Sequence, residues 1–362
     1  MNIRVISGEG TLDTIGDAAC ACGMSRVLIV ADQGIVAAGF IARAAETLRE
    51  SAVAPFFFHD FGPNPDTTMV EAGRARAAAD EIDGIIAIGG GSSLDCAKGI
   101  NFVLTNGGSM RDYRGHGKAT RPMLPSIGVP TTAGTGSEAQ SFAIISDAET
   151  HAKMACGDSK AAFRIVILDP ALTVTQPREV TAVAGYDAIS HAVEAFVTRT
   201  RTAPSQALAL DSWRLLEGNY ERVLHVPGDL SARGAMLVGA NRAGAAIELS
   251  MLGATHACAN PLTARYGTTH GIAVAVMLPH VVRWNTDSVS ELYRDLRPSG
   301  DLAERLDQLG RAGGLPRSLR EIGVARSDLE SLAADAATQW TGQHNPRAFD
   351  ARAARALYEA AW

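Results

Sequence analysis

The sequence has few cysteines, no excess of basic residues and no long apolar run. The five cysteines are an odd number without the paired spacing of a zinc site, so we expect reduced thiols in a cytoplasmic protein. A net charge of −6 removes the electrostatic basis for binding nucleic acid or an anionic membrane. No apolar stretch approaches the ~20 residues that cross a bilayer, and the N-terminal residues lack a secretory pattern. We therefore expect a soluble globular protein.

The first half of the chain alternates strand-like and helix-like segments. Residues 26–31, 53–59 and 84–88 are short runs of apolar and β-branched residues, and helical patterns such as residues 67–82 separate them. Continuous apolar strands of this kind are typical of a parallel sheet that is covered on both faces. The sequence therefore predicts a doubly wound, nucleotide-binding α/β domain.

The second half of the chain loses the strand signal and becomes rich in alanine and leucine with helical periodicity. A chain of 362 residues can form two domains with separate cores. We place the boundary between residues 170 and 178, which gives an α/β dinucleotide-binding domain at 1–175 and a helical, metal-binding domain at 176–362. Further short helices are expected at 302–314, 319–322, 327–340 and 351–362.

One carboxylate and three imidazoles in the second half suit a divalent metal ion. Asp187 and His191 stand four residues apart and share one face of a helix, and His256 and His270 follow downstream. This mixture of ligands favours Fe²⁺, Zn²⁺, Ni²⁺ or Co²⁺ over the oxygen-seeking Mg²⁺ and Ca²⁺. Four protein ligands are also compatible with a closed structural site, so catalysis needs an open coordination position.

A glycine-rich loop follows the third predicted strand. Gly89, Gly90 and Gly91 lead into Ser92 and a helix, so backbone N–H groups and the positive helix end could hold a pyrophosphate. The pattern is neither the Gly-x-Gly-x-x-Gly fingerprint nor a Walker loop, and a simple tight turn explains it equally well.

Two further polar features follow predicted strands of the same sheet. The loop 130–138, Pro-Thr-Thr-Ala-Gly-Thr-Gly-Ser-Glu, offers hydroxyl groups to phosphate, ribose or nicotinamide, although a surface loop could carry the same residues. Asp32 could accept hydrogen bonds from an adenosine ribose and repel a 2′-phosphate, or it could simply cap a helix. Open α/β sheets bind nucleotides at the edge where these loops are expected.

The motifs taken together resemble those of the iron-containing (group III) alcohol dehydrogenases. The chain contains, in order, Gly-Gly-Gly-Ser-x-x-Asp-x-Ala-Lys, Pro-Thr-Thr-Ala-Gly-Thr-Gly-Ser-Glu, Asp-x-x-x-His, and two further histidines ahead of Leu-Pro-His. The resemblance covers nearly the whole chain. It implies the dehydroquinate synthase-like fold of this family, in which an N-terminal nucleotide-binding α/β domain is followed by a helical domain.

The resemblance also implies roles for individual residues. The catalytic metal ligands are expected to be Asp187, His191, His256 and His270. Asp32 occupies the position associated with preference for NAD over NADP, and Lys153 matches a lysine that faces the cofactor ribose. The positions expected to bind the cofactor are Asp32, Gly90, Gly91, Ser92, Asp95, Thr131, Thr132, Thr135 and Lys153.

The resemblance predicts a metal-dependent, NAD(H)-linked interconversion of a small primary alcohol and its aldehyde. Fe²⁺ is the first choice of metal and Zn²⁺ the alternative, and a homodimer formed through the N-terminal β-edge is expected for this family. Asn260 stands where many members carry a further histidine near the nicotinamide. Asparagine does not titrate near neutral pH, so a proton relay through that position must take another route.

Other activities within the same superfamily stay open. Glycerol dehydrogenase-like, maleylacetate reductase-like and anionic small-aldehyde reductase functions are the alternatives, although the complete ligand set disfavours the metal-free maleylacetate reductases. A nucleotide-binding protein without turnover is the alternative outside enzymes, and Asn260 is the only sequence feature in its favour.

Overall fold

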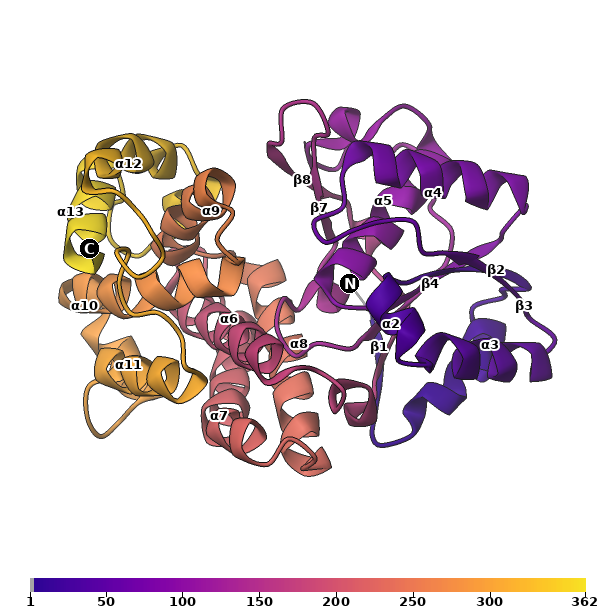
Figure 1. The fold of residues 1–362 in the computed structure, drawn as a ribbon, viewed down its shortest axis with the longest axis horizontal. Coiled ribbons are helices and arrows are strands. Elements are labelled where there is room, and N and C mark those ends of the chain that lie inside the picture. The colour runs from indigo at the N-terminus through magenta and orange to yellow at the C-terminus, as the bar shows by residue number, and fades with distance from the viewer. Residues whose placement is uncertain (1–2) are drawn as a thin grey trace. The chain divides into compact units, whose positions relative to one another are not determined.

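The computed structural model of the protein describes residues 3–362, and the chain forms two compact units. The first unit contains the chain up to Thr132 together with Ser137–Thr175, and the second contains Ala133–Gly136 and Gln176–Trp362. In Figure 1 the first unit runs from indigo to purple and the second is mostly magenta to yellow.

A parallel six-stranded sheet forms the centre of the first unit. Its strand order is β1-β9-β6-β4-β2-β3, and every neighbouring pair is parallel. The inner strands are continuous apolar runs, which agrees with burial on both faces of the sheet. The strands are β1 (Arg4–Ser7), β2 (Arg26–Val30), β3 (Ala54–Phe58), β4 (Gly84–Gly89), β6 (Ser126–Pro130) and β9 (Ile165–Leu168).

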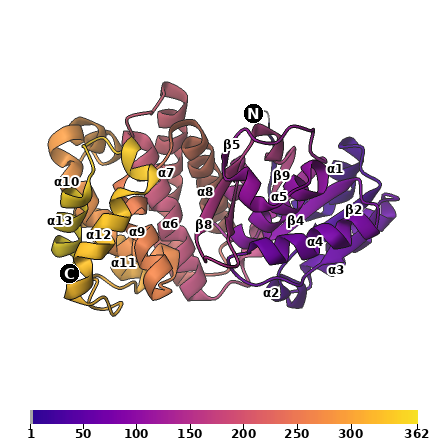
Figure 2. The same cartoon turned by 90° about the horizontal axis from the view of Figure 1, so that it is seen from above.

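Helices cover both faces of this sheet. Ile15 of α1 and Leu48 of α3 join an apolar cluster with Val27 and Ile86 of the strands. On the other face α4 and α5 lie side by side, as Figures 1 and 2 show. The predicted doubly wound α/β architecture is confirmed. The helices are α1 (Ile15–Ala21), α2 (Gln33–Ala37), α3 (Phe40–Glu50), α4 (Thr67–Ala79) and α5 (Gly91–Asn106).

The sequence patterns gave no sign of a second, smaller sheet in this unit. It has the order β5-β8-β7, with β7 and β8 antiparallel and β5 parallel to β8. Its strands are β5 (Gly115–His116), β7 (Phe142–Ser146) and β8 (Lys153–Gly157).

The second unit is built from helices around α6. This helix is buried on almost all sides, and it packs against α7, α8 and α10. One apolar cluster joins α6, α7, α8 and α11, and another joins α9, α12, α13 and the first part of α10. The predicted all-α character of residues 176–362 is confirmed. The helices are α6 (Arg178–Val197), α7 (Ala203–His225), α8 (Leu230–Ser250), α9 (Ala254–Tyr266), α10 (His270–Leu296), α11 (Leu302–Gly313), α12 (Leu329–Ala337) and α13 (Ala351–Ala361).

The helix expected at residues 319–322 is wrong. This segment forms consecutive turns, in which the N–H of Val324 donates to the carbonyl of Leu319 and Gly323 has a φ of 78°. Pro316 precedes the segment and Gly323 ends it, so too few residues remain to nucleate a helix.

All five cysteines are free, and three of them are buried. In the described part of the chain, no helix is both long and apolar enough to cross a membrane.

Candidate active site

Asp187 and His191 lie in the middle of α6, the most buried helix of the second unit. Each residue is 5% exposed, and Asp187 Oδ1 lies 3.6 Å from His191 Nε2. The spacing of four residues places both side chains on one face of the helix, as the sequence predicts. A carboxylate so deeply buried needs a charged or coordinating partner.

Two more imidazoles approach the same carboxylate oxygen from other helices. His256 lies in the first turn of α9, and His270 is the first residue of α10. Their Nε2 atoms are 3.8 Å and 4.0 Å from Asp187 Oδ1. The His256 ring stacks on His191 at 4.9 Å and is tilted against His270 at 5.3 Å between ring centroids. All three imidazoles predicted as ligands therefore lie within 4.0 Å of the fourth predicted ligand, Asp187.

The chemistry of this cluster fits a divalent metal ion. Asp187 Oδ1 and His256 Nε2 are buried, and neither has a hydrogen-bond partner among the described residues. Ligand atoms of Asp187, His256 and His270 lie within 4.8 Å of one another. Ligands about 2.1 Å from a tetrahedral ion are about 3.4 Å apart. The histidine nitrogens 3.6–4.0 Å from Asp187 Oδ1 therefore need to approach it by only a few tenths of an ångström, whereas the wider separations within the trio, up to 4.8 Å, need a larger contraction. His191 is outside the compact trio but lies beside Asp187.

The electrostatics of the cluster keep the carboxylate ionised. Burial by itself raises the pKa of Asp187, but His191 and the other imidazoles outweigh it and hold that pKa well below its usual range. Burial lowers the pKa of His191, because it penalises the charged ring. Burial also acts to lower the pKa of His256, yet Asp187 and Glu194 together raise it to about 9.

Most of the residues expected to bind the nucleotide follow the carboxyl ends of three neighbouring strands, whereas Asp95 lies within α5 and Lys153 begins β8 of the smaller sheet. Asp32 follows β2, the glycine loop follows β4, and the loop 130–138 follows β6. From β2 the chain continues to β3 on one side, and from β4 it continues to β6 on the other. The connections therefore reverse direction between β2 and β4, which is where open α/β sheets bind nucleotides.

The glycine loop leads directly into helix α5. Gly89 has a φ of 152°, and a Cβ there would collide with the Ser93 hydroxyl at 2.3 Å, so this position needs glycine. Gly90 precedes the helix, and no side chain caps its N-terminus. A helix start of this kind, opened by Gly91 and Ser92, leaves N–H groups for an anion such as a pyrophosphate.

Asp32 caps helix α2 and also contacts the glycine loop. Its Oδ1 accepts hydrogen bonds from the N–H groups of Gly34 and Ile35, and its Oδ2 accepts one from the Ser93 hydroxyl at 3.2 Å. The capping alternative is therefore present in the structure. Because a carboxylate can accept several hydrogen bonds, capping leaves acceptor capacity for a ribose.

Asp95 is buried within α5 and has a structural partner. It accepts a hydrogen bond from the Ser137 hydroxyl, and burial raises the pKa of its carboxyl. Lys153, at the start of β8, adds a positive charge that acts on Asp95. Lys98, one turn after Asp95, donates to the carbonyl oxygens of Ser137, Gln140 and Phe142 at 2.6–2.8 Å.

The threonine loop is divided between the two units. The N–H of Thr131 donates to the Gly89 carbonyl at 3.0 Å, and the Thr132 side chain lies 3.4 Å from the place of a Cβ on Gly90. Thr131 and Thr132 thus lie beside the glycine loop. Thr135 belongs to the segment 133–136, which packs with the second unit.

Comparison with known sequences identifies the family. Residues 2–170 match the family described as iron-containing alcohol dehydrogenase, and residues 181–362 match its C-terminal family, Fe-containing alcohol dehydrogenase family, C-terminal. The chain belongs to the iron-containing alcohol dehydrogenases. The predicted family and the predicted enzyme class are confirmed.

Several dehydrogenases and reductases resemble the chain along nearly its whole length. An NAD-dependent methanol dehydrogenase from Bacillus methanolicus is 32% identical over 94% of this chain and 93% of its own. The crystal structure of a 1,3-propanediol oxidoreductase superposes with a TM-score of 0.96 at 30% identity, covering 99% of this chain and 98% of the other. A sulfoacetaldehyde reductase from Bifidobacterium kashiwanohense, crystallised with NAD⁺, has a TM-score of 0.92 at 26% identity, covering 99% and 97%.

Two residues of this iron-containing alcohol dehydrogenase were not singled out by the sequence patterns. Glu194, two helical turns after Asp187, pairs with His256, and Lys98 anchors the turn and strand that follow the threonine loop. The spacing Asp187, His191, Glu194 on one helical face was a usable signal for Glu194. Asn260, at the position of the histidine found in many members, donates to Gln339 Oε1 at 3.1 Å.

Proposed function

We propose that the chain catalyses the reversible NAD(H)-dependent interconversion of a small primary alcohol and its aldehyde. The family match and the named relatives support this reaction class. The observation that carries the proposal is the convergence of three imidazoles on the buried, unpartnered oxygen of Asp187. We assign the nucleotide to residues 1–175 and the metal to 176–362.

The chain's own residues prepare the metal site. Asp187, His256 and His270 would hold the ion, with His191 beside Asp187 as the fourth ligand, and the ionised Asp187 would lower the net charge of the site. A divalent ion at this point supplies Lewis-acid polarisation of the alcohol or carbonyl oxygen. We propose Fe²⁺ as the resident metal, in agreement with the family, and Zn²⁺ as the alternative. Both metals are compatible with a mixed imidazole and carboxylate ligand set.

The residues at the sheet edge orient the nicotinamide cofactor. We propose that the first turn of α5 binds the pyrophosphate, that Asp32 binds the adenosine ribose, and that the hydroxyls of the threonine loop bind the nicotinamide side. The position at the reversal between β2 and β4 supports this assignment. The negative charge of Asp32 favours NAD over NADP, because it repels a 2′-phosphate.

The substrate class follows from the relatives together with the surface charges. Their printed names include methanol, 1,3-propanediol and sulfoacetaldehyde, so we propose a short alcohol or aldehyde. Arg265 could have served an anionic substrate, but its guanidinium is bound to Asp335 and Ser331. A neutral substrate is therefore the first choice.

We further propose a cytoplasmic homodimer that is joined along β1. This strand is at the end of the sheet, pairs on one side with β9, and exposes Val5 to 45%. An edge strand with free backbone groups can pair with a second copy. Light scattering after size-exclusion chromatography tests the dimer, and replacement of Val5 by lysine should shift it toward monomer.

The test of the proposed function is NADH oxidation with a panel of short neutral and anionic aldehydes. Metal-stripped protein is compared with protein reloaded anaerobically with Fe²⁺ or Zn²⁺. Turnover that returns only with metal supports the proposal. Turnover that is indifferent to metal favours the metal-free reductases, and NADH binding without turnover favours a silent nucleotide-binding protein.

A further inference from the structure

Glu194 is a buried carboxylate beside the four predicted metal ligands. Metal coordination does not explain the role of Glu194. It lies on the same face of α6 as Asp187 and is 4% exposed. Each of its oxygens has a distinct partner. Oε2 lies 2.6 Å from His256 Nδ1, and Oε1 accepts a hydrogen bond from the N–H of Thr255 at 2.7 Å.

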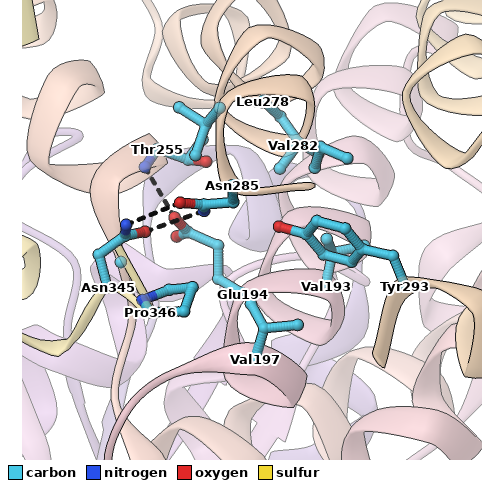
Figure 3. A pocket seen from close by; sticks show the side chains of 12 residues that line it. Val193, Glu194, Val197, Thr255, Leu278, Val282, Asn285, Tyr293, Asn345 and Pro346 are labelled. Carbon is cyan, nitrogen blue, oxygen red and sulfur yellow. Dashed lines mark hydrogen bonds between the residues drawn. The ribbon is translucent and has the colours of Figure 1, made fainter. Parts of the chain in front are cut away.

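A small polar network lies beside this carboxylate. Asn285 and Asn345 form two reciprocal amide hydrogen bonds of 3.1 Å and 2.9 Å, and Asn345 Oδ1 also accepts from the N–H of Ala254 at 3.2 Å. Figure 3 shows the Asn285–Asn345 pair next to Glu194, with the bond from Thr255. The network thus satisfies the first free N–H groups of α9, the helix that carries His256.

Close packing fixes the geometry of this network. A Cβ on Gly253 would lie 3.0 Å from both Glu194 Oε1 and Asn345 Oδ1. Any larger residue would push these acceptors away from the start of α9. The absence of a side chain at Gly253 therefore lets two acceptors from distant parts of the sequence reach the same helix end.

We propose that Glu194 is a positioning residue that holds His256 in the tautomer required for metal binding. The inference rests on the proposed metal site. An ionised carboxylate accepts hydrogen bonds but does not donate them, so His256 Nδ1 must carry the hydrogen. In the neutral ring that binds a metal, the lone pair is then on Nε2, which is the atom 3.8 Å from Asp187 Oδ1 and without a hydrogen-bond partner among the described residues.

A purely structural role for Glu194 is the competing explanation. Its bond to Thr255 caps α9, and removal of a capping group destabilises a helix regardless of any metal. The two roles use different oxygens, so one substitution can separate them. Glutamine has the same shape as glutamate but offers one acceptor and one donor.

The variant E194Q places these two roles in conflict. If the glutamine oxygen caps Thr255, its NH₂ group faces His256 Nδ1 and forces the ring hydrogen onto Nε2. The Nε2 lone pair is then no longer available to bind the metal. If the amide is reversed, its NH₂ group opposes the N–H of Thr255 and the cap is lost. The first arrangement weakens metal binding, and the second lowers the melting temperature of the metal-free protein.

The experiment measures Zn²⁺ affinity by chelator competition, the visible spectrum of the Co²⁺-loaded protein and the melting temperature of the metal-free protein. We expect E194Q to bind Zn²⁺ roughly 10–100-fold more weakly, the scale for loss of a partner of a ligating histidine. Its Co²⁺ spectrum should change, whereas its melting temperature should stay close to that of the wild type.

The matched control is N345A, which removes the other acceptor at the start of α9 without touching His256. It should lower the melting temperature but retain the Zn²⁺ affinity and the Co²⁺ spectrum. E194Q with wild-type Zn²⁺ affinity and an unchanged melting temperature would overturn the inference, whereas wild-type affinity with a lowered melting temperature indicates the reversed amide, whose oxygen still accepts from His256 Nδ1. A wild-type protein that binds no stoichiometric metal would instead overturn the proposed function.

A second measurement keeps the inference testable if E194Q does not fold. Histidine ¹⁵N NMR of the zinc-loaded wild-type protein distinguishes the two ring nitrogens of His256. The inference requires a hydrogen on Nδ1 and the metal on Nε2. A metal bound through Nδ1 would refute it.

Discussion

Asp187 Oδ1 and His191 Nε2 lie 3.6 Å apart within one turn of a helix that is buried on almost all sides. Two histidines from other helices approach the same oxygen. This arrangement concentrates polar atoms where the surrounding residues are apolar, and it is stable only if the carboxylate is compensated.

The first prediction concerns the charge of this carboxylate. D187N keeps the shape of the side chain but removes its charge, so the protein should lose its bound metal. Aldehyde reduction should fall by roughly 100-fold or more, the scale of losing one electrostatic group in an active site. Metal content by mass spectrometry and NADH oxidation check this. D211N, which alters an exposed carboxylate paired with Arg242, should change neither.

The second prediction concerns pH and metal affinity. The neighbouring carboxylates raise the pKa of His256 from 6.5 to about 9 in the metal-free chain, so a metal ion must displace a proton. Zn²⁺ affinity should therefore rise with pH between 6.5 and about 9. Calorimetry in two buffers of different ionisation enthalpy should detect proton release as a difference between the observed binding heats, and identical observed heats in the two buffers would contradict it.

The raised pKa of His256 gives the stability of the metal-free fold the opposite pH dependence: stability falls as pH rises. Because the folded chain binds this proton more tightly than the unfolded chain, the stabilisation is fully present below pH 6.5 and is lost as pH rises through 9. Melting temperatures of metal-free protein over that range, with H256A as control, test the sign. A metal-free protein that gains stability from His256 at high pH would disagree.

The third prediction concerns cofactor choice. D32S removes the charge but keeps a hydroxyl that can cap α2. The kcat/KM with NADPH should therefore rise relative to the kcat/KM with NADH. We expect the ratio of the two kcat/KM values to move by ~10-fold, or about 1.4 kcal/mol. D301S loses a capping aspartate of α11 and serves as the control. An unchanged ratio in D32S would show that Asp32 only caps its helix.

The fourth prediction uses two helical glycines. A Cβ on Gly244 of α8 would lie 2.3 Å from the carbonyl oxygen of Gly136, whereas one on Gly218 of α7 would meet nothing within 4 Å. G244A should destabilise the protein by roughly 1–3 kcal/mol. G218A should stabilise it by roughly 0.5–1 kcal/mol, because alanine favours a helix over glycine. Denaturant unfolding distinguishes them, and equal effects would refute the packing argument.

The sequence predicted the features that depend on local pattern. The buried strand at residues 84–88 is a continuous apolar run, the helices at 302–314 and 351–362 have helical periodicity, and the structure contains all three. The four residues predicted as ligands also come together in space. Their assignment as ligands remains a prediction until metal is measured.

The features that were missed depend on distant partners. β1 has a short, mostly exposed sequence and becomes a strand by pairing with β9. The strands β7 and β8 lie between polar turns, so neither carries a long apolar run. Glu194 pairs with a histidine 62 residues away, and Lys98 with carbonyl groups about 40 residues away. Spacing within one element cannot reveal such partners.

The distribution of the four predicted ligands over three helices also determines when, during synthesis of the chain, all four residues are present. Asp187 and His191 leave the ribosome on α6, but His270 is the first residue of α10 and follows only after α7, α8 and α9. A nascent chain that ends before α10 therefore carries at most three of the four ligands. The complete set of four residues is therefore present only after most of the helical unit has been translated, so the proposed metal site cannot be complete before that point.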